Sequence, residues 1–210
     1  MPDLVLYTNP MSRGRIARWM LEEIGEPYEV VNLDYGTTMK APDYLAINPM
    51  GKVPALMHGE TIVTEGAAIC TYLGDAFPER QLAPTLQDPR RGAYLRWMFF
   101  GAGPVEAAVT NGHMKWEASE DQQAMLGYGS LSQVLGTLEH LVGAAPYLLG
   151  DRFSALDVYL GSQIIWGTQF GTMEMRPGFE DYVARVTARH AYHKAKSLDD
   201  AALPQPKETA

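Results

Sequence analysis

Two short segments carry polar groups of the kind that hold an anion. The segment "LYTNPMSRGR" (6–15) offers a phenol, an amide and a serine hydroxyl, and the serine stands at the start of a predicted helix. The segment "TEG" (64–66) stands at the start of another predicted helix. The first N–H groups of a helix lack partners within it and its dipole is positive at this end, so both segments favour an anionic ligand.

A third segment, "NPMGKVPAL" (48–56), places a proline where a buried strand is expected to begin. Pro54 has no N–H to give to a sheet, so it indicates an edge or an irregular stretch. Lys52 adds a cation just before it.

Other reactive side chains do not form a recognisable pattern. The five histidines (58, 113, 140, 190 and 193) show no spacing typical of metal ligands with Cys or acidic residues. Cys70 lies within the apolar run "AAICTYL" and is interpreted as buried packing. The sequence therefore predicts no metal site.

Composition narrows the class of protein. The chain has 210 residues, of which 46% are hydrophobic and 20% charged, with a net charge of −8 and no basic patch. Nucleic acid and anionic membranes are therefore not expected as partners. No stretch approaches the ~18 apolar residues of a membrane span, and no secretory signal is visible. With a single cysteine, these features predict a cytoplasmic protein without an internal disulfide.

The first third of the chain alternates strand and helix. Apolar spacing predicts strands at 4–8 and 28–33, a helix at 13–25 that ends at Gly25, a hairpin at 53–63 turning at His58–Gly59, and a helix at 64–77 with Thr64 as its N-cap. The order βαβ then ββα implies a small mixed sheet with helices packed on it.

The remainder reads as helical after a proline-rich linker at 78–89. Helices are predicted at 90–113, 119–143, 155–170 and 178–196. Ser154 and Asp157 have the spacing of a capping box at the start of the third of these. The polar end of the chain is expected to be disordered.

At this point the chain resembles the glutathione S-transferase family. The motifs "NPMGKVPAL", "TEGAAICTYL" and "FSALDVYLG" occur in the family's order and at its usual distances. The resemblance implies an α/β plus all-α architecture, with a thioredoxin-like domain at 1–80, a linker at 81–89, an all-helical domain at 90–197 and a disordered tail at 198–210.

The resemblance also implies a site for the tripeptide glutathione as co-substrate. The Val53–Pro54 bond is cis in this family, and the free backbone groups of Val53 pair with the extended peptide. Glu65 pairs with the γ-glutamyl ammonium, and the Gly66 N–H receives the γ-glutamyl carboxylate. The family usually has serine where Gly66 stands, so one hydrogen bond to that carboxylate is missing here.

Two lysines are candidates for the glycine carboxylate of glutathione. Lys52 matches a family lysine that approaches this group, and Lys40 is a weaker candidate from a poorly alignable loop. Asp157 matches a structural position, and its capping role explains it without any chemistry.

The catalytic task implied by the family is to stabilise the glutathione thiolate, since a thiol has a pKa of about 8.5. Ser12 matches the "S-x-x-R" of a serine-dependent, bacterial-type branch, and this is the leading assignment. Tyr7 falls where other branches place a catalytic tyrosine, and Asn9 is a third possible donor. A branch with cysteine in place of Ser12 forms mixed disulfides, and that chemistry is not expected.

The second substrate is expected to be an apolar electrophile held between the domains, near Met11, Phe100, Glu106 and Trp166. The resemblance thus implies a homodimeric transferase in detoxification, without a bound cofactor. An isomerase, dehalogenase or peroxidase on the same scaffold and a non-catalytic binding or regulatory relative remain alternatives.

Overall fold

The computed structural model describes residues 3–116 and 118–204. The described chain divides by packing into two compact units. The first contains 3–73 together with 189–204, and the second contains 74–188.

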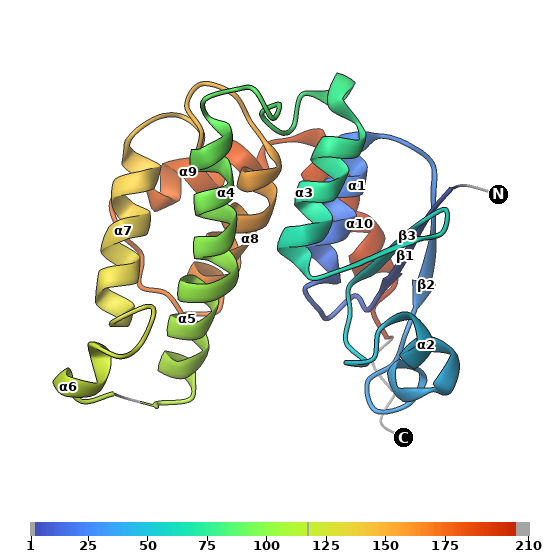
Figure 1. The fold of residues 1–210 in the computed structure, drawn as a ribbon, viewed down its shortest axis with the longest axis horizontal. Coiled ribbons are helices and arrows are strands. Elements are labelled where there is room, and N and C mark those ends of the chain that lie inside the picture. Colours follow the sequence, from blue (N-terminus) through green and yellow to red (C-terminus); the bar gives the residue numbers. More distant parts are fainter. Residues whose placement is uncertain (1–2, 117, 205–210) are drawn as a thin grey trace. The chain divides into compact units, whose positions relative to one another are not determined.

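The first unit is built on a four-stranded sheet with the order β2-β1-β3-β4. The strands are β1 (Leu4–Thr8), β2 (Tyr28–Asn32), β3 (Ala55–His58) and β4 (Thr61–Thr64). β2 runs parallel to β1, whereas β3 and β4 follow as an antiparallel hairpin. The mixed sheet and the thioredoxin-like architecture are as expected from the sequence (Figure 1).

Helices cover this sheet. They are α1 (Gly14–Ile24), η1 (Thr38–Lys40), α2 (Pro42–Ile47) and the start of α3 (Gly66–Ala76), whereas α10 (His190–Ala201) packs against α1. In β1 the burial alternates, so Leu4, Leu6 and Thr8 are buried on one face and Val5 and Tyr7 are half-buried on the other. This period of two is the property of a strand that the sequence analysis used.

Helix α1 shows the predicted helical period. Ile16, Met20 and Ile24 repeat every four residues and are at most 1% exposed. Gly25 ends the helix in the left-handed region, with φ of 75°, and its N–H donates to the Leu21 carbonyl. The predicted helix and its glycine stop are confirmed.

Helix α10 corrects the expectation about the end of the chain. It continues through Ala201, so residues 198–201 are helical rather than disordered. It also packs against α1 and belongs to the first unit, although the sequence analysis placed 90–197 in one helical domain. The last six residues of the predicted tail, 205–210, lie outside the described residues.

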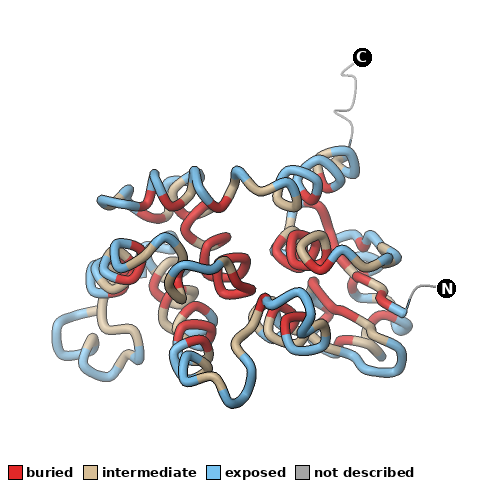
Figure 2. Tube along the Cα trace, turned by 90° about the horizontal axis from the view of Figure 1, so that it is seen from above, coloured by how far each residue is buried: buried red, intermediate tan, exposed pale blue. Residues whose placement is uncertain are grey.

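The second unit is helical, and its buried residues gather on the inner faces of its helices (Figure 2). After η2 (Pro78–Arg80), its helices are α4 (Arg91–Phe100), α5 (Glu106–His113), α6 (Glu120–Gln123), α7 (Leu131–Gly143), α8 (Ala155–Gln169) and α9 (Phe179–Thr187). A π-helical turn, Gly101–Val105, joins α4 to α5 and contains Pro104.

Helix α8 forms the centre of this unit. Leu156, Val158 and Ile164 are completely buried, so the helix is covered on several sides. The predicted capping box of Ser154 and Asp157 is present at its start. Asp157 is itself buried, and its carboxylate accepts hydrogen bonds from several donors.

Several predicted boundaries are wrong. The helix expected at 119–143 is two helices, α6 and α7, each with its own capping box, at Ser119 and Ser130. The helix expected at 178–196 is interrupted between α9 and α10. Thr64 ends β4 instead of capping α3, and the hairpin turns at Gly59–Glu60.

Candidate functional site

The register of the sheet brings three loops to one end of it. Tyr7 lies opposite Ala55, and Ala55 lies opposite Thr64. The loop after β1, the segment before β3 and the start of α3 after β4 therefore leave the sheet at the same end. We call this the loop end of the sheet, and it carries the candidate residues of all three sequence motifs.

Ser12 lies in the loop between β1 and α1 and is half-buried. Its hydroxyl donates to the Asn9 carbonyl at 2.7 Å and accepts the Gly14 N–H at 2.9 Å. The Asn9 carbonyl also accepts the Ser12 N–H at 3.0 Å. This carbonyl therefore keeps a partner when the Ser12 hydroxyl proton turns toward another acceptor.

Asn9 is a buried anchor of the same loop, with 5% of its surface exposed. Its side-chain Nδ2 donates to the Leu33 carbonyl at 2.7 Å, and its Oδ1 accepts the Met11 N–H at 2.9 Å. The amide nitrogen therefore joins the loop to the chain beyond β2, and the amide oxygen fixes the turn of the loop itself.

Tyr7 projects from the opposite face of the sheet to Thr8 and α1. Its ring packs against Tyr44 of α2, with ring centroids 5.6 Å apart. Its hydroxyl donates to the thioether sulfur of Met57 at 3.3 Å. Met57 lies opposite Val5, so the phenol leans away from the loop end.

The segment before β3 is held by the carbonyl of Lys52. That oxygen accepts the Tyr44 hydroxyl and the Asn48 Nδ2, the latter at 2.8 Å. The Val53–Pro54 peptide bond is cis. Within the described chain, neither the N–H nor the carbonyl of Val53 makes a hydrogen bond, so both are available to an extended peptide.

The start of α3 has an unusual backbone. Glu65 is exposed and has φ of 67°, in the left-handed region that few side chains other than Asn and Asp occupy. Its carbonyl accepts the Ile69 N–H at 2.9 Å, so the first turn of the helix begins there. Backbone strain of this kind costs about 1–3 kcal/mol and is found most often at ligand sites.

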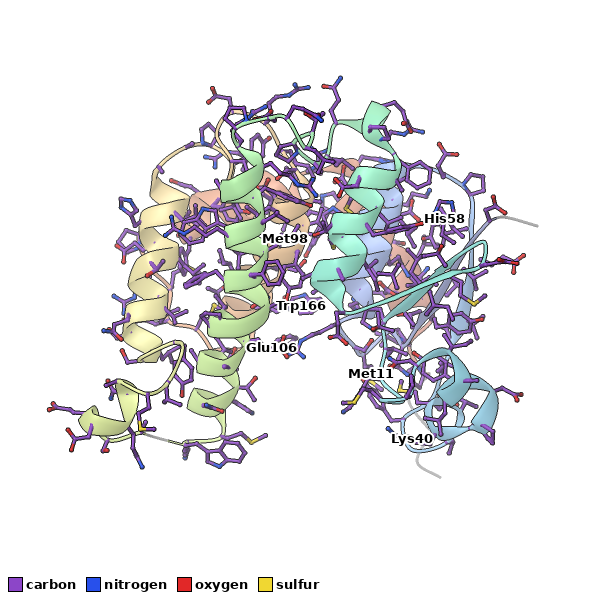
Figure 3. The ribbon with its side chains drawn as sticks, viewed as in Figure 1. Met11, Lys40, His58, Met98, Glu106 and Trp166 are labelled. Carbon is purple, nitrogen blue, oxygen red and sulfur yellow. The ribbon has the colours of Figure 1, made fainter. Side chains whose placement is uncertain are left out.

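The two candidate lysines differ in their surroundings. Lys40 donates to the carbonyls of Met50 and Gly51, at 3.0 and 2.9 Å, and so supports the loop before Lys52. Gly51 has φ of 56°, and a Cβ there would lie 2.7 Å from the Met39 carbonyl oxygen. Lys52 is exposed. In Figure 3, Met11 and Lys40 lie at one end of the first unit, whereas His58 lies at the other.

The sequence analysis missed what holds the loop of Ser12 in place. Arg15 donates to the Pro10 carbonyl and binds Asp200 of α10 at 2.8 Å. One turn later, Arg18 binds Asp199 at 2.8 Å, and both of these side chains are at most 5% exposed. The two acids of "SLDD", Asp199 and Asp200, could have indicated partners for these arginines, but the sequence analysis placed them in a disordered tail.

The electrostatics of these two carboxylates differ. Burial raises the pKa of Asp199, and the Arg18 guanidinium opposes this shift. Hydrogen bonds from Lys196 and then from Arg15 lower the pKa of Asp200, which is more exposed. Helix α1 is thus joined to α10 by two ion pairs, a half-exposed one from Arg15 and a buried one from Arg18.

The residues expected around the electrophile are distributed over both units. Met11 belongs to the first unit and is 62% exposed. Phe100 belongs to α4 of the second unit, and Glu106 and Trp166, which Figure 3 labels, belong to its α5 and α8. Phe100 packs edge-on against Trp97, with ring centroids 5.4 Å apart.

Other reactive groups lie outside the loop end. Cys70 is fully buried, and burial raises the pKa of its thiol, as expected for a packing residue. Among the described residues, no three His, Cys, Asp or Glu side chains are arranged to hold a metal ion. No helix in the described chain has the length and apolar character needed to cross a bilayer.

Comparison with known proteins identifies the first unit's fold and its family. A family model for the glutathione S-transferase N-terminal domain matches residues 2–75. A probable glutathione S-transferase, GSTF2, of Oryza sativa subsp. japonica is 32% identical over 205 residues, covering 85% of this chain and 88% of the relative. A maleylacetoacetate isomerase of Pseudomonas aeruginosa is 30% identical over 178 residues, covering 80% and 82%.

Solved structures show the same architecture. A glutathione transferase from Methylococcus capsulatus has a TM-score of 0.78 and 29% identity, covering 94% of this chain and 99% of that one. A sphingomonad glutathione S-transferase complexed with glutathione has a TM-score of 0.76 and 25% identity, covering 93% and 98%. Since these matches span both units, the chain belongs to the glutathione S-transferase family.

Proposed function

We propose that the protein is a glutathione transferase that binds glutathione at the loop end of its sheet and stabilises the thiolate of the bound tripeptide. The observation that carries this proposal is the convergence of three elements at that end. They are the Ser12 loop, the open backbone of Val53 and the start of α3 at Glu65. Family membership and the glutathione-bound sphingomonad structure support it.

Each end of glutathione has a complementary group in this arrangement. The N–H and carbonyl of Val53 pair with the backbone of the cysteinyl residue as an added strand. The γ-glutamyl carboxylate meets the Gly66 N–H at the start of α3, and the γ-glutamyl ammonium meets Glu65. The glycine carboxylate lies toward Lys52, and Lys40 supports that loop with one ammonium proton still available.

The Ser12 hydroxyl is the proposed donor to the sulfur anion, as in the serine-dependent bacterial branch. Lowering the thiol pKa by two units requires about 2.7 kcal/mol. A hydrogen bond to a charged acceptor contributes about 1.5–3 kcal/mol, and the N-terminus of α1 adds to it. The geometry of the alternatives supports Ser12, because the Tyr7 hydroxyl leans toward Met57 and the Asn9 amide is anchored.

The thiolate then attacks an apolar electrophile. Its proposed contacts are Met11, Phe100, Glu106 and Trp166. We also propose that the active form is a homodimer. The single cysteine fits a cytoplasmic, reducing location.

The test is titration calorimetry with glutathione. The wild-type protein should bind at millimolar concentration or below, and Glu65→Gln should weaken binding at least about tenfold, which is about 1.4 kcal/mol. Glu60→Gln is the matched control, since Glu60 is an exposed acid at the opposite end of the same hairpin. Equal affinity of the Glu65 variant and the wild type would contradict the assignment.

Gly66→Ser is the complementary variant, because it adds a hydroxyl at the proposed carboxylate position. A hydrogen bond to a carboxylate contributes about 1.5–3 kcal/mol, so affinity should rise at least about tenfold. Unchanged or weaker binding would show that the γ-glutamyl carboxylate does not lie at this helix start.

A second candidate function is glutathione-dependent isomerisation, which the Pseudomonas aeruginosa relative favours. Both functions use the same thiolate, but a transferase leaves glutathione bonded to the product, whereas an isomerase releases it again. A transferase should conjugate glutathione to a nitro-activated aryl halide. An isomerase should instead convert a cis enedione to its trans form without consuming glutathione, and parallel assays of the two substrates separate the candidates.

A further inference from the structure

Thr8, the last residue of β1, carries a hydroxyl that the proposed function has not used. The residue is completely buried and faces α1 together with Leu4 and Leu6. Its Oγ1 has no hydrogen-bond partner among the described residues. A buried hydroxyl without a partner is unfavourable, and it calls for an explanation in terms of another state of the protein.

This hydroxyl points at the start of α1, beside Ser12. A Cβ built on Gly14 would lie 1.8 Å from Thr8 Oγ1 and 3.0 Å from Ser12 Oγ. Both hydroxyl oxygens therefore flank the same point next to Gly14. The absence of a side chain at Gly14 leaves the space that the Thr8 hydroxyl occupies.

The Ser12 hydroxyl oxygen has room for one more hydrogen-bond donor. In the ligand-free protein its oxygen accepts the Gly14 N–H and its proton goes to the Asn9 carbonyl. A hydroxyl oxygen has two lone pairs, so one stays open both in this state and when the proton turns to a sulfur anion. A neighbouring hydroxyl that donates to this lone pair would complete the hydrogen bonds of Ser12 Oγ.

We propose that Thr8 is a positioning residue, whose hydroxyl donates to Ser12 Oγ when Ser12 donates to the glutathione thiolate. This inference rests on the proposed function of Ser12. The chain of hydrogen bonds, from Thr8 to Ser12 to sulfur, polarises the serine hydroxyl and makes it a stronger donor. The thiol proton itself leaves to solvent, so Thr8 and Ser12 remain neutral throughout.

Removing the Thr8 hydroxyl should affect the ligand-free protein and the glutathione complex differently. In the ligand-free protein the Thr8 hydroxyl gains nothing from its position, so replacing it with a methyl group of the same shape should not destabilise the fold. In the glutathione complex the same replacement should make the thiolate less stable and so raise the pKa of the bound thiol. A purely structural threonine would instead lose stability in both states.

The experiment compares Thr8→Val, which keeps the shape, with Thr8→Ser, which keeps the hydroxyl. The readouts are the pKa of bound glutathione, from thiolate absorbance against pH, and the melting temperature without ligand. Thr8→Val should lower the acid dissociation constant of the bound thiol about threefold, which is a rise of about half a unit in its pKa. Without ligand, this variant should melt no lower than wild type. Thr8→Ser should keep the wild-type pKa.

Thr187→Val is the matched control, because that hydroxyl donates to the Val183 carbonyl within α9 of the other unit. It should leave the thiol pKa unchanged. A normal thiol pKa in the wild-type complex would contradict the proposed function itself. A lowered wild-type pKa that Thr8→Val does not change would overturn only the role of Thr8, as would a Thr8→Val protein that melts lower without ligand.

Discussion

At the scale of single residues, Ser12 differs from the other two candidate donors in the contacts that are broken when its side chain turns toward a ligand. The Asn9 carbonyl keeps the Ser12 N–H when the hydroxyl leaves it. The Asn9 amide, by contrast, joins its loop to Leu33, and the Tyr7 ring is packed against Tyr44. A catalytic donor must be free to change partner, and the Ser12 hydroxyl meets this requirement at small cost.

The prediction for Ser12 concerns the pKa of bound glutathione. Ser12→Ala should raise it by at least one unit, which corresponds to about 1.4 kcal/mol of lost thiolate stabilisation. Tyr7→Phe should shift it much less, because that hydroxyl contacts the Met57 sulfur. The measurement is thiolate absorbance against pH, and a larger shift in Tyr7→Phe would transfer the catalytic role to Tyr7.

Asp157 illustrates a residue whose role was predicted correctly from spacing alone. Its two oxygens accept the N–H groups of Leu148 and Ser154, at 3.0 and 2.9 Å, and the hydroxyl of Tyr182 at 3.1 Å. The capping box was readable from a four-residue motif. The bonds to Leu148 and Tyr182 were not, because these residues lie outside the motif, in the connection before α8 and in α9.

We expect Asp157→Ala to lower the free energy of unfolding by about 3 kcal/mol or more, because it leaves several buried donors without an acceptor. Denaturant unfolding would measure the loss. Asp151→Ala, at an exposed position shortly before α8, is the control and should change stability by less than about 0.5 kcal/mol. Near-equal stability of the two variants would show that the buried network contributes little.

At the scale of elements, short-range patterns predicted the sheet and α1 well. The period of two in β1 and the glycine stop at Gly25 depend on neighbours in sequence. The break between α6 and α7 was missed, although capping residues Ser119 and Ser130 mark both starts. The prediction followed the helical spacing of apolar residues, which continues across the break, instead of these two capping residues.

The docking of α10 could not be predicted in this way. Arg18 and Asp199 are 181 positions apart, and no local pattern links them. The same holds for the convergence of loops at the loop end, which depends on the strand register. The motifs of the family indicated the candidate residues, but the register explains why they meet.

The contact between α1 and α10 carries a pH dependence. Lys196 and Arg15 lower the pKa of Asp200 in the folded protein. Its contribution to stability is therefore present above the unfolded pKa of about 3.9 and is lost as the pH falls through the lower folded value. Because the carboxylate is partly exposed, salt should weaken this contribution.

Asp200→Asn should accordingly melt below wild type near neutral pH, and the difference should shrink as the pH falls below about 4 or as salt is added. Thermal melts across a pH series would measure it. Asp181→Asn, in the exposed first turn of α9 in the other unit, is the control. A difference from wild type that grew on acidification would contradict the assigned sign.

At the scale of the whole molecule, we expect a homodimer in which the helix at 65–77 and the helix after the linker bury apolar surface. Phe99 of α4 supports this expectation, since 74% of its surface is exposed. Aromatic side chains are enriched at the centres of protein–protein interfaces. The two-fold symmetry usual for such pairs would bring the same patch together from both copies.

Light scattering with size-exclusion chromatography at micromolar concentration should give a dimeric mass for the wild type. Phe99→Asp should shift the mass toward the monomer, because it places a charge in the proposed interface. Met125→Asp, at a position 89% exposed in the α6–α7 connection, should leave the dimer intact. A monomeric wild-type mass would count decisively against the dimer.

The return of α10 to the first unit also bears on how the chain folds during synthesis. The sheet and α1 leave the ribosome early, but Asp199 and Asp200, which bind Arg18 and Arg15, follow only after the whole second unit. Contacts of such long sequence separation form slowly, because a long loop must close first. The loop that carries Ser12 therefore lacks its link from Arg15 to Asp200 until α10 has been made.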